Sequence, residues 1–377
     1  MQQTEFTEAW EVLADFLPAG WQEQARVCEA MQRARGQIRR ADVLLRLILL
    51  HASGGLSLEQ AALRAREQKL VDVTAVALFK RLRSSGRWLE WMTAEMVKER
   101  AKAWDEKVWG NRPIRILDST DILEPGPRGT DWRLHYSLRL PQLSCDFLRV
   151  TDATEGESLK RLPVRRGDIV LADRGYSHRA AVAQILSQGA DVAVRLNSTS
   201  FPLEDASKDP ISLTQEVKGL KIGLAIDKPV WFRHEGHRHR MRLCAIRKSQ
   251  TAAARARRKA EKDSLKKGHE PQPETLQLAG FVLILTSLPI QWGSSWKVLE
   301  LYRQRWQVEL AFKRLKSLLA LGHVPKSTDP SSRAWMQAKI LTALLIERLI
   351  TECRCFSPWG YRLHGGATMA PLQGSPG

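Results

Sequence analysis

Short apolar runs of four to seven residues, separated by polar segments, dominate the sequence from residue 114 to 172 and limit the fold more than any other feature. They are Ile114–Leu117, Leu134–Leu140, Phe147–Val150 and Asp168–Ala172. Runs this short, some with period-two alternation, are typical of β-strands. An amphipathic helix is expected next, at 178–187, and then another short strand at 191–196. Strands that begin to alternate with helices predict an α/β fold, a mixed sheet flanked by helices.

The segments on either side of these strands have different patterns. Before residue 112 the apolar residues recur at helical spacing and no strand is predicted, whereas 198–292 combines strand patterns with a helix rich in Ala, Arg and Lys at 251–267. One long helix is expected from 296 to about 321, and another at 332–352. We therefore expect a helical N-terminal DNA-binding domain, a first part of the core, an inserted β-rich block, a helical completion of the core, and a tail without fixed structure, at 1–111, 112–197, 198–292, 293–354 and 355–377.

Basic residues outnumber acidic ones in this chain by 59 to 41, a formal net charge of +18. Much of the surplus lies in two stretches: residues 247–267 hold nine basic and two acidic side chains, and residues 295–339 nine and three. Such basic stretches favour a polyanionic partner, since Lys and Arg gain affinity for phosphates by counterion release. DNA is therefore a candidate partner.

A membrane or an export route has no support in the sequence. No apolar run reaches the roughly 18 residues that span a bilayer, and the first residues lack the cationic and apolar order of a secretory signal. The five cysteines are an odd number and form no Cys-x-x-Cys pair. We expect a cytoplasmic protein without membrane contact.

Two short helices in the first segment could bind DNA. Ser57 and Thr74 are candidate N-caps, and the second helix carries Lys80 and Arg81. A basic second helix resembles that of a helix-turn-helix. A charged, solvated face of a helical bundle explains the pattern equally well.

Acidic residues stand where two of the expected strands end. Asp118 follows Arg-Ile-Leu, and Asp173 follows Asp-Ile-Val-Leu-Ala; Asp121 is a rival for Asp118. A single aspartate at a strand end more often caps a turn. If these two converge with Glu309 of the long helix, however, their mutual repulsion calls for a bound cation, and oxygen ligands favour Mg²⁺ or Mn²⁺.

Four polar residues share one stripe of the expected long helix. On a helix of about 100° per residue, Tyr302, Arg305, Glu309 and Lys316 lie within an arc of about 60°. A carboxylate between two cations and a phenol suits a metal ligand beside a phosphate track. An ion pair within the helix, Arg305 with Glu309, is the simpler interpretation.

At these residues the sequence resembles a known family. Tyr302-x2-Arg305-x3-Glu309-x6-Lys316 matches the signature of DDE transposases of bacterial insertion sequences of the insertion-sequence-four type. The preceding order, Asp-Ser-Thr-Asp from Asp118 and then Val-Leu-Ala-Asp-Arg-Gly-Tyr around Asp173, is similar to theirs. The resemblance covers roughly residues 112–340. It implies an RNase H-like mixed-sheet core, interrupted by a mainly β insertion between the second aspartate and the glutamate, with helical regions at both ends.

The same resemblance implies the chemistry. Asp118, Asp173 and Glu309 would be the catalytic triad and would bind Mg²⁺ (or Mn²⁺), as two ions. Tyr302, Arg305 and Lys316 would contact phosphates at the transposon end, and Arg174 would do likewise.

The expected reaction is metal-dependent cleavage at the transposon ends, followed by strand transfer into target DNA through in-line phosphoryl transfer. The partners would be the terminal inverted repeats and target DNA, with a homodimer in the complex and association with the nucleoid when bound to DNA. The alternative is a DNA-end-binding protein that has lost catalysis and inhibits transposition.

Overall fold

The computed structural model describes residues 10–31, 37–102, 112–126, 132–152, 154–266, 268–325 and 329–355. The chain forms two compact units, one of residues 1–96 with 324–377 and one of residues 97–323. The range 293–354, expected to complete the core, is therefore divided between them. Apart from Cys355, the expected tail at 355–377 lies outside the described residues.

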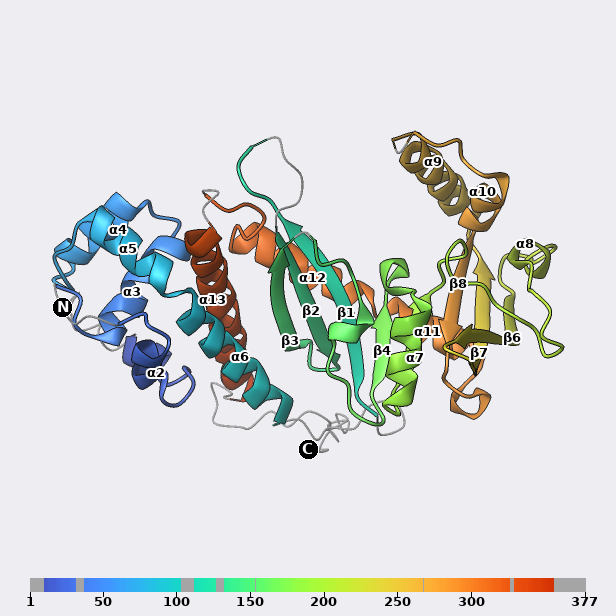
Figure 1. The fold of residues 1–377 in the computed structure, drawn as a ribbon, viewed down its shortest axis with the longest axis horizontal. Coiled ribbons are helices and arrows are strands. Elements are labelled where there is room, and N and C mark those ends of the chain that lie inside the picture. Colours follow the sequence, from blue (N-terminus) through green and yellow to red (C-terminus); the bar gives the residue numbers. More distant parts are fainter. Residues whose placement is uncertain are drawn as a thin grey trace, which may run out of the picture. The chain divides into compact units, whose positions relative to one another are not determined.

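The first unit is helical in its described part (Figure 1). Its helices are α2 (Trp21–Val27), α3 (Ala41–Ala52), α4 (Leu58–Glu67), α5 (Ala75–Ser84), most of α6 (Gly86–Lys102) and α13 (Asp329–Cys355). Trp88 of α6 is fully buried, stacks on Trp21 with ring centroids 6.1 Å apart, and donates a hydrogen bond of 2.7 Å to the Trp21 carbonyl. Large aromatic residues of this kind supply much of the stabilisation of a small helical core.

Two helix starts expected from the sequence are confirmed. Ser57 caps α4, with a reciprocal hydrogen bond between its backbone and the side chain of Gln60, and the Thr74 hydroxyl accepts a hydrogen bond from the Ala77 N–H at the start of α5. Caps of this kind satisfy N–H groups that have no partner within the helix.

The second unit is built on one sheet in the order β3-β2-β1-β4-β5-β8-β7-β6. The strands are β1 (Ile114–Ile122), β2 (Trp132–Leu140), β3 (Ser144–Asp152), β4 (Ile169–Ala172), β5 (Asp191–Arg195), β6 (Ala225–His234), β7 (His237–Arg247) and β8 (Phe281–Thr286). β4 runs parallel to both β1 and β5, and the other neighbours are antiparallel. The expected mixed sheet is thus present.

The strands of the expected insertion, at 198–292, belong to the same sheet as the core. β8 pairs with β5, so that β8, β7 and β6 extend the same sheet as the preceding strands. Three further helices belong to this region: α8 (Leu213–Glu216), α9 (Gln250–Lys266) and α10 (Pro273–Ala279). Because β5 lacks another neighbour on that side, its backbone groups need this pairing.

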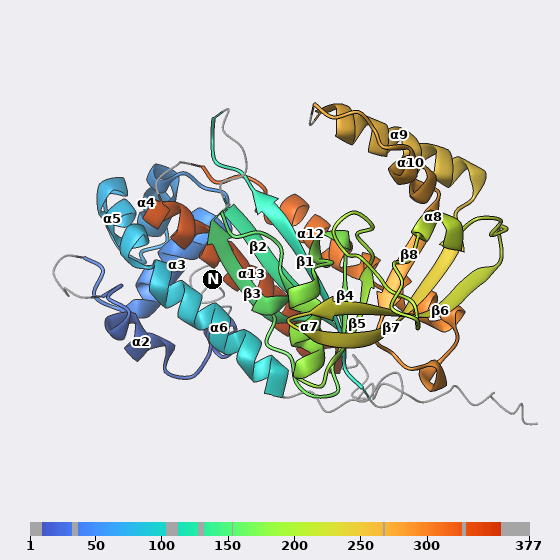
Figure 2. The same ribbon diagram turned by 45° about the vertical axis from the view of Figure 1, so that its right-hand side comes forward.

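Helices cover both faces of the sheet. Figures 1 and 2 show α7 (Arg179–Ser187) on one face and α12 (Trp306–Leu318) on the other. α7 buries Ala181, Val182 and Ile185 in the core against β4 and β5. On the opposite face Phe312 of α12 meets Tyr136 of β2 edge to face, with ring centroids 5.8 Å apart. The described residues of the unit also form three 3₁₀ turns: η1 (Leu159–Arg161), η2 (Arg174–Tyr176) and η3 (Ile290–Trp292).

The prediction of a single long helix from residue 296 is wrong. The structure has two helices, α11 (Ser295–Arg303) and α12, with a tightened turn between them. There the N–H of Arg305 bonds the carbonyl of Tyr302 at 3.0 Å, and the N–H of Val308 bonds that of Arg305 at 3.2 Å. Such three-residue steps tighten the backbone relative to an α-helix. Arg305 therefore stands at the start of α12.

No described helix is both long and apolar enough to cross a membrane.

Candidate active site

Asp118 and Asp173 come together through the register of two parallel strands. The last pair in the β1–β4 ladder is Leu117 with Ala172, and the next residue on each strand is an aspartate. Both therefore lie at the sheet edge where parallel strands present their carboxyl ends. The charge of Asp173 also acts on Asp118, where it helps to raise the pKa.

Glu309 reaches this edge from α12, which packs across β1 and β2. Beyond the helix, the Leu123 N–H donates to the Gly322 carbonyl at 3.0 Å, so the chain after α12 is fastened beside β1. Arg305 then joins the two acids: its Nη1 donates to Asp118 Oδ2 at 3.2 Å and its Nη2 to Glu309 Oε1 at 2.5 Å. One guanidinium thus bridges carboxylates from distant parts of the chain.

The electrostatics of Asp118 are those of a buried acid among like charges. Its pKa is raised to about 7, chiefly by burial and also by the carboxylates of Asp173 and Glu157, while the Ser119 N–H at 2.8 Å and Arg305 oppose the rise. A carboxyl group that is buried among other acids is stabilised in its neutral form unless a cation is present. A further cation at this position would favour the charged form of Asp118.

Tyr302 also faces this group of acids. Its side chain is buried, and its hydroxyl has no hydrogen-bond partner within the described part of the chain. Burial, together with the charge of Asp173, raises the pKa of this phenol. A buried hydroxyl without a partner indicates that the site is completed by a further group.

The carboxylate oxygens of the candidate acids suit a hard divalent cation, although they are not yet arranged around a common point. Carboxylate oxygens are the ligands that Mg²⁺ and Mn²⁺ prefer. Among the described residues, no group of three or more His, Cys, Asp or Glu side chains is already positioned to hold an ion. In this conformation the Arg305 guanidinium bridges Asp118 and Glu309, where it neutralises part of their charge.

Glu157 is a further acid of the site that sequence reasoning missed. Its Oε1 accepts a hydrogen bond of 2.8 Å from Ser119, the residue after Asp118. Its Oε2 occupies the space beside Gly175, two residues after Asp173: a Cβ at Gly175 would lie 1.7 Å from that oxygen. Glu157 therefore touches both aspartate segments. It lies in a loop, where no strand or helix pattern marks it.

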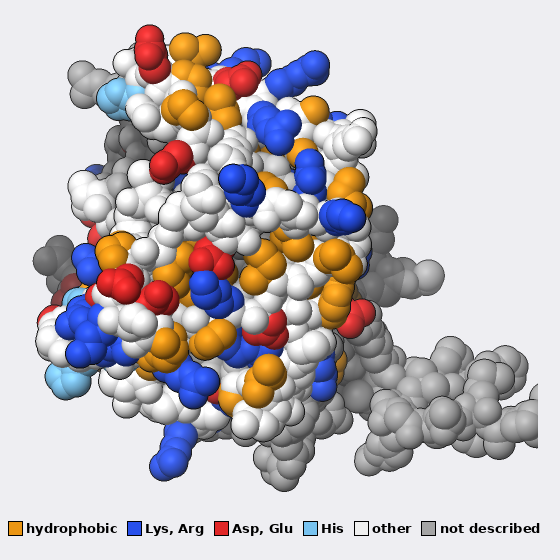
Figure 3. Space-filling view, turned by 90° about the vertical axis from the view of Figure 1, so that its right-hand side faces the viewer, with side chains coloured by type: hydrophobic (Ala, Val, Ile, Leu, Met, Phe, Trp, Pro, Cys, Tyr) orange, Lys and Arg blue, Asp and Glu red, His pale blue; other side chains and the backbone are white. Residues whose placement is uncertain are grey.

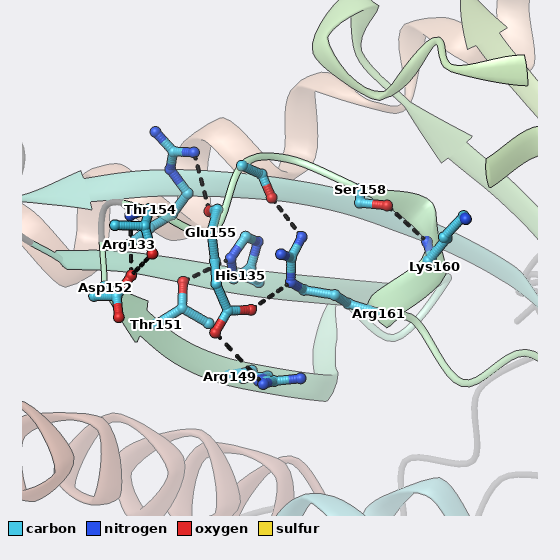
Figure 4. Close-up of polar contacts among 11 residues, drawn as sticks. Arg133, His135, Arg149, Thr151, Asp152, Thr154, Glu155, Ser158, Lys160 and Arg161 are labelled. Carbon is cyan, nitrogen blue, oxygen red and sulfur yellow. Dashed lines mark hydrogen bonds and ion pairs between the residues drawn. The ribbon is translucent and has the colours of Figure 1, made fainter. Parts of the chain in front are cut away.

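A network of arginines holds the loop that carries Glu157 (Figure 4). Arg161 donates to Glu155 Oε2 at 3.1 Å, and Arg133 donates to the Glu155 carbonyl at 3.4 Å. Between them lies His135, which is buried and bonded to the Thr151 hydroxyl at 3.0 Å. Burial and the neighbouring arginines lower the pKa of His135 to about 4, so that it is neutral at pH 7.

Asp121, the rival of Asp118, belongs to the other face of the sheet. Side chains alternate along a strand, so a residue three positions away points to the opposite side. Its carboxylate is 47% exposed and pairs with Arg133 at 3.1 Å. The geometry favours Asp118 over Asp121 as a partner of Glu309.

The remaining predicted DNA contacts fall in two places. Arg174 lies next to Asp173, whose charge acts on it, and Lys316 is exposed on the last turn of α12. Lys80 and Arg81 belong to α5 in the other compact unit. Lys80 is exposed, whereas Arg81 donates to the Ala30 carbonyl at 3.4 Å.

Comparisons with known proteins identify the family of this chain. Residues 149–345 match the family model of the transposase DDE domain. The chain is 33% identical over 342 residues to the putative transposase InsL for insertion sequence element IS186A of Escherichia coli strain K12, covering 89% of this chain and 91% of that protein. It is also 33% identical to the transposase for insertion sequence element IS421 of Escherichia coli, over the same shares of the two chains.

The chain therefore belongs to the family of DDE transposases of bacterial insertion sequences. It is a DNA transposase, an enzyme of the polynucleotidyl transferase and endonuclease class. Members of this family generally use divalent metal ions. The mixed α/β sheet with its flanking helices is consistent with an RNase H-like DDE domain.

Proposed function

We propose that Asp118, Asp173 and Glu309 are the catalytic and metal-binding acids of this transposase. The observation that carries the proposal is the bridge made by Arg305 between Asp118 and Glu309, beside Asp173 at the same sheet edge. A carboxyl group whose pKa is raised by burial and by a neighbouring carboxylate, as at Asp118, is common at catalytic sites.

These carboxylates would hold divalent cations, proposed as two Mg²⁺ or Mn²⁺ ions, whose positive charge would polarise a phosphodiester and lower the pKa of a water molecule. The first reaction is hydrolysis: a water oxygen forms a bond to phosphorus and the bond from phosphorus to the 3′ oxygen breaks. The 3′ oxygen takes up a proton and leaves as a hydroxyl. In strand transfer, that 3′ hydroxyl attacks a phosphodiester of the target DNA in the same manner.

Tyr302, Arg305 and Lys316 have the chemistry to hold DNA phosphates beside the acids, as their resemblance, with Glu309, to the insertion-sequence-four signature implies. Arg305 would exchange its carboxylate partners for phosphate oxygens, since guanidinium binds either group with two parallel hydrogen bonds. Arg174 extends this cationic edge next to Asp173. Lys80 and Arg81 of α5 are proposed as further DNA contacts, through the basic helix of the other unit.

The test is a nicking assay on DNA that carries the ends of the element, with Mg²⁺ or Mn²⁺ and with EDTA. We expect Asp118→Asn to reduce cleavage by at least about a thousandfold, because removal of one ligand of an essential metal site is rarely tolerated. Asp121→Asn is the matched control on the same strand and should cleave normally.

Two results would change the assignment. If Asp121→Asn is inactive and Asp118→Asn is active, the triad is wrong. If the unmutated protein binds the ends but never cuts them with either metal, the chain is an end-binding inhibitor. We also propose the homodimer that the resemblance implies, and the mass of the complex with end DNA in light scattering tests it separately.

A further inference from the structure

One face of α9 carries a continuous stripe of cations. At about 100° per residue, five basic side chains lie within an arc of about 100°, and no acidic residue falls inside it. They are Arg255, Arg258, Lys259, Lys262 and Lys266, all exposed. At about 1.5 Å per residue the stripe is about 16 Å long.

The opposite face of α9 is occupied by the protein. Ala253 is buried there, and Arg257 donates to the Leu276 carbonyl of α10 at 3.4 Å. A Cβ at Gly280 would touch Ala253 at 3.8 Å, so the two helices are fastened where they join the sheet. The cationic stripe therefore faces away from α10.

The strand order places this helix pair at the same sheet edge as the candidate acids. β1, β4 and β5 run in parallel towards that edge: Asp118 lies within β1, four residues before its end, Asp173 directly follows β4, and Arg195 ends β5. β8 is antiparallel to β5 and β7 to β8, so β7 ends and β8 begins at the same edge, with α9 and α10 between them. Figures 1 and 2 both show the pair standing out beyond these strand ends.

Further cations lie between the acids and α9. Arg195, at the end of β5, acts electrostatically on both Arg174 and Lys248. Lys248 follows β7, and burial together with Arg195 lowers its pKa to about 8. In Figure 3, Lys and Arg side chains lie among acidic and hydrophobic ones over the part of the surface formed by α9 and α10. Arg174, Arg195 and Lys248 thus place positive charge along the edge between the acids and α9.

We propose that the α9 stripe binds the sugar–phosphate backbone of a DNA duplex whose reacting phosphodiester lies at the acids. The stripe contains no aromatic side chain on which bases could stack, a feature that single-strand sites use. Backbone contacts by Lys and Arg fix the position of a duplex without reading its sequence. This inference rests on the DNA-cleaving function proposed above and names a second contact region for the same DNA.

The experiment measures binding in EDTA, so that its outcome does not depend on catalysis. The probes are a duplex of random sequence, about four helical turns long, and a single strand of the same length, each at several salt concentrations. The stripe variant combines Arg258→Gln, Lys259→Gln and Lys262→Gln; glutamine keeps the helix propensity. The matched control removes the same charge from exposed loop lysines of the same unit, by Lys208→Gln, Lys218→Gln and Lys221→Gln.

For the duplex, we expect the stripe variant to bind about tenfold or more weakly than the unmutated protein at about 0.1 M salt. Its slope of log K against log salt should become shallower by about 2 to 3, because each phosphate that a cation neutralises contributes about 0.9 to that slope. The slope of the control variant should stay within about 0.5 of the slope of the unmutated protein. Equal slopes in the two variants would overturn the proposal. The proposal would also be overturned if the stripe variant bound the single strand more weakly than the unmutated protein but bound the duplex equally well. The stripe would then be a single-strand site.

Discussion

At the scale of single residues, Asp118 makes the metal-free protein sensitive to pH. Its pKa is raised from 3.8 to about 7, so between these values the folded state binds more protons than the unfolded state. The free energy of unfolding therefore falls as pH rises through this window, and the loss is complete above about pH 7. The carboxylate that the chemistry requires destabilises the fold when no cation is bound.

We predict that Asp118→Asn raises the Tm of the metal-free protein at pH 8 by about 2 to 4 °C, although it abolishes cleavage. At pH 5 the two proteins should have nearly the same Tm, because the aspartate is then neutral. Thermal melts in EDTA at both pH values check this. A Tm difference of equal size at pH 5 and pH 8 would contradict the assigned cause.

Glu157 gives a second prediction at this scale. Glu157→Gln keeps an acceptor for Ser119 but removes a negative charge that acts on Asp118. We expect the Mg²⁺ concentration for half-maximal cleavage to rise about three- to tenfold, since less negative charge attracts the cation. A metal titration of the cleavage rate measures it. Asp152→Asn, an exposed acid of β3, is the control, and the prediction fails if both variants shift alike.

At the scale of elements, the apolar patterns predicted the strands well but not the end of a helix. The spacing of Leu301, Val308 and Phe312 continues unbroken across the turn at Arg305, so the sequence contains no signal for it. The register that sets Asp118 beside Asp173 follows from strand pairing, which periodicity alone does not determine. Glu157 was missed because its partners, Ser119 and Gly175, come from two other segments.

Because α12 carries Glu309, its packing on β2 should control the site. We predict that Phe312→Ala lowers the free energy of unfolding of this unit by about 3 kcal/mol, because the ring of Tyr136 would no longer have a packing partner there. Urea denaturation followed by circular dichroism measures the change. Leu318→Ala, on the same helix but 78% exposed, should stay within about 0.5 kcal/mol. Similar losses in both variants would show that α12 is not held by Phe312.

At the scale of the whole molecule, all three candidate acids belong to one of the two compact units. We predict that Mg²⁺ slows hydrogen exchange in that unit, at the segments 114–122, 169–176 and 305–312, because a ligand that binds only the folded state stabilises the segments around its site. Exchange in α3, α4 and α5 should not change. Mass spectrometry measures hydrogen exchange in these segments with Mg²⁺ and with EDTA. If exchange slowed only in the helical unit, the proposed metal site would be contradicted.

The contact between Glu157 and Gly175 has a consequence for how relatives of this enzyme diverge. With a carboxylate oxygen filling the space of a Cβ, alanine at 175 requires the Glu157 side chain to leave its present position. The two positions are therefore expected to co-evolve: a residue larger than glycine at position 175 should be accompanied by a side chain shorter than glutamate at position 157. An alignment of many transposases would reveal this as a correlated pair, and a compensating double mutant would reproduce it in the laboratory.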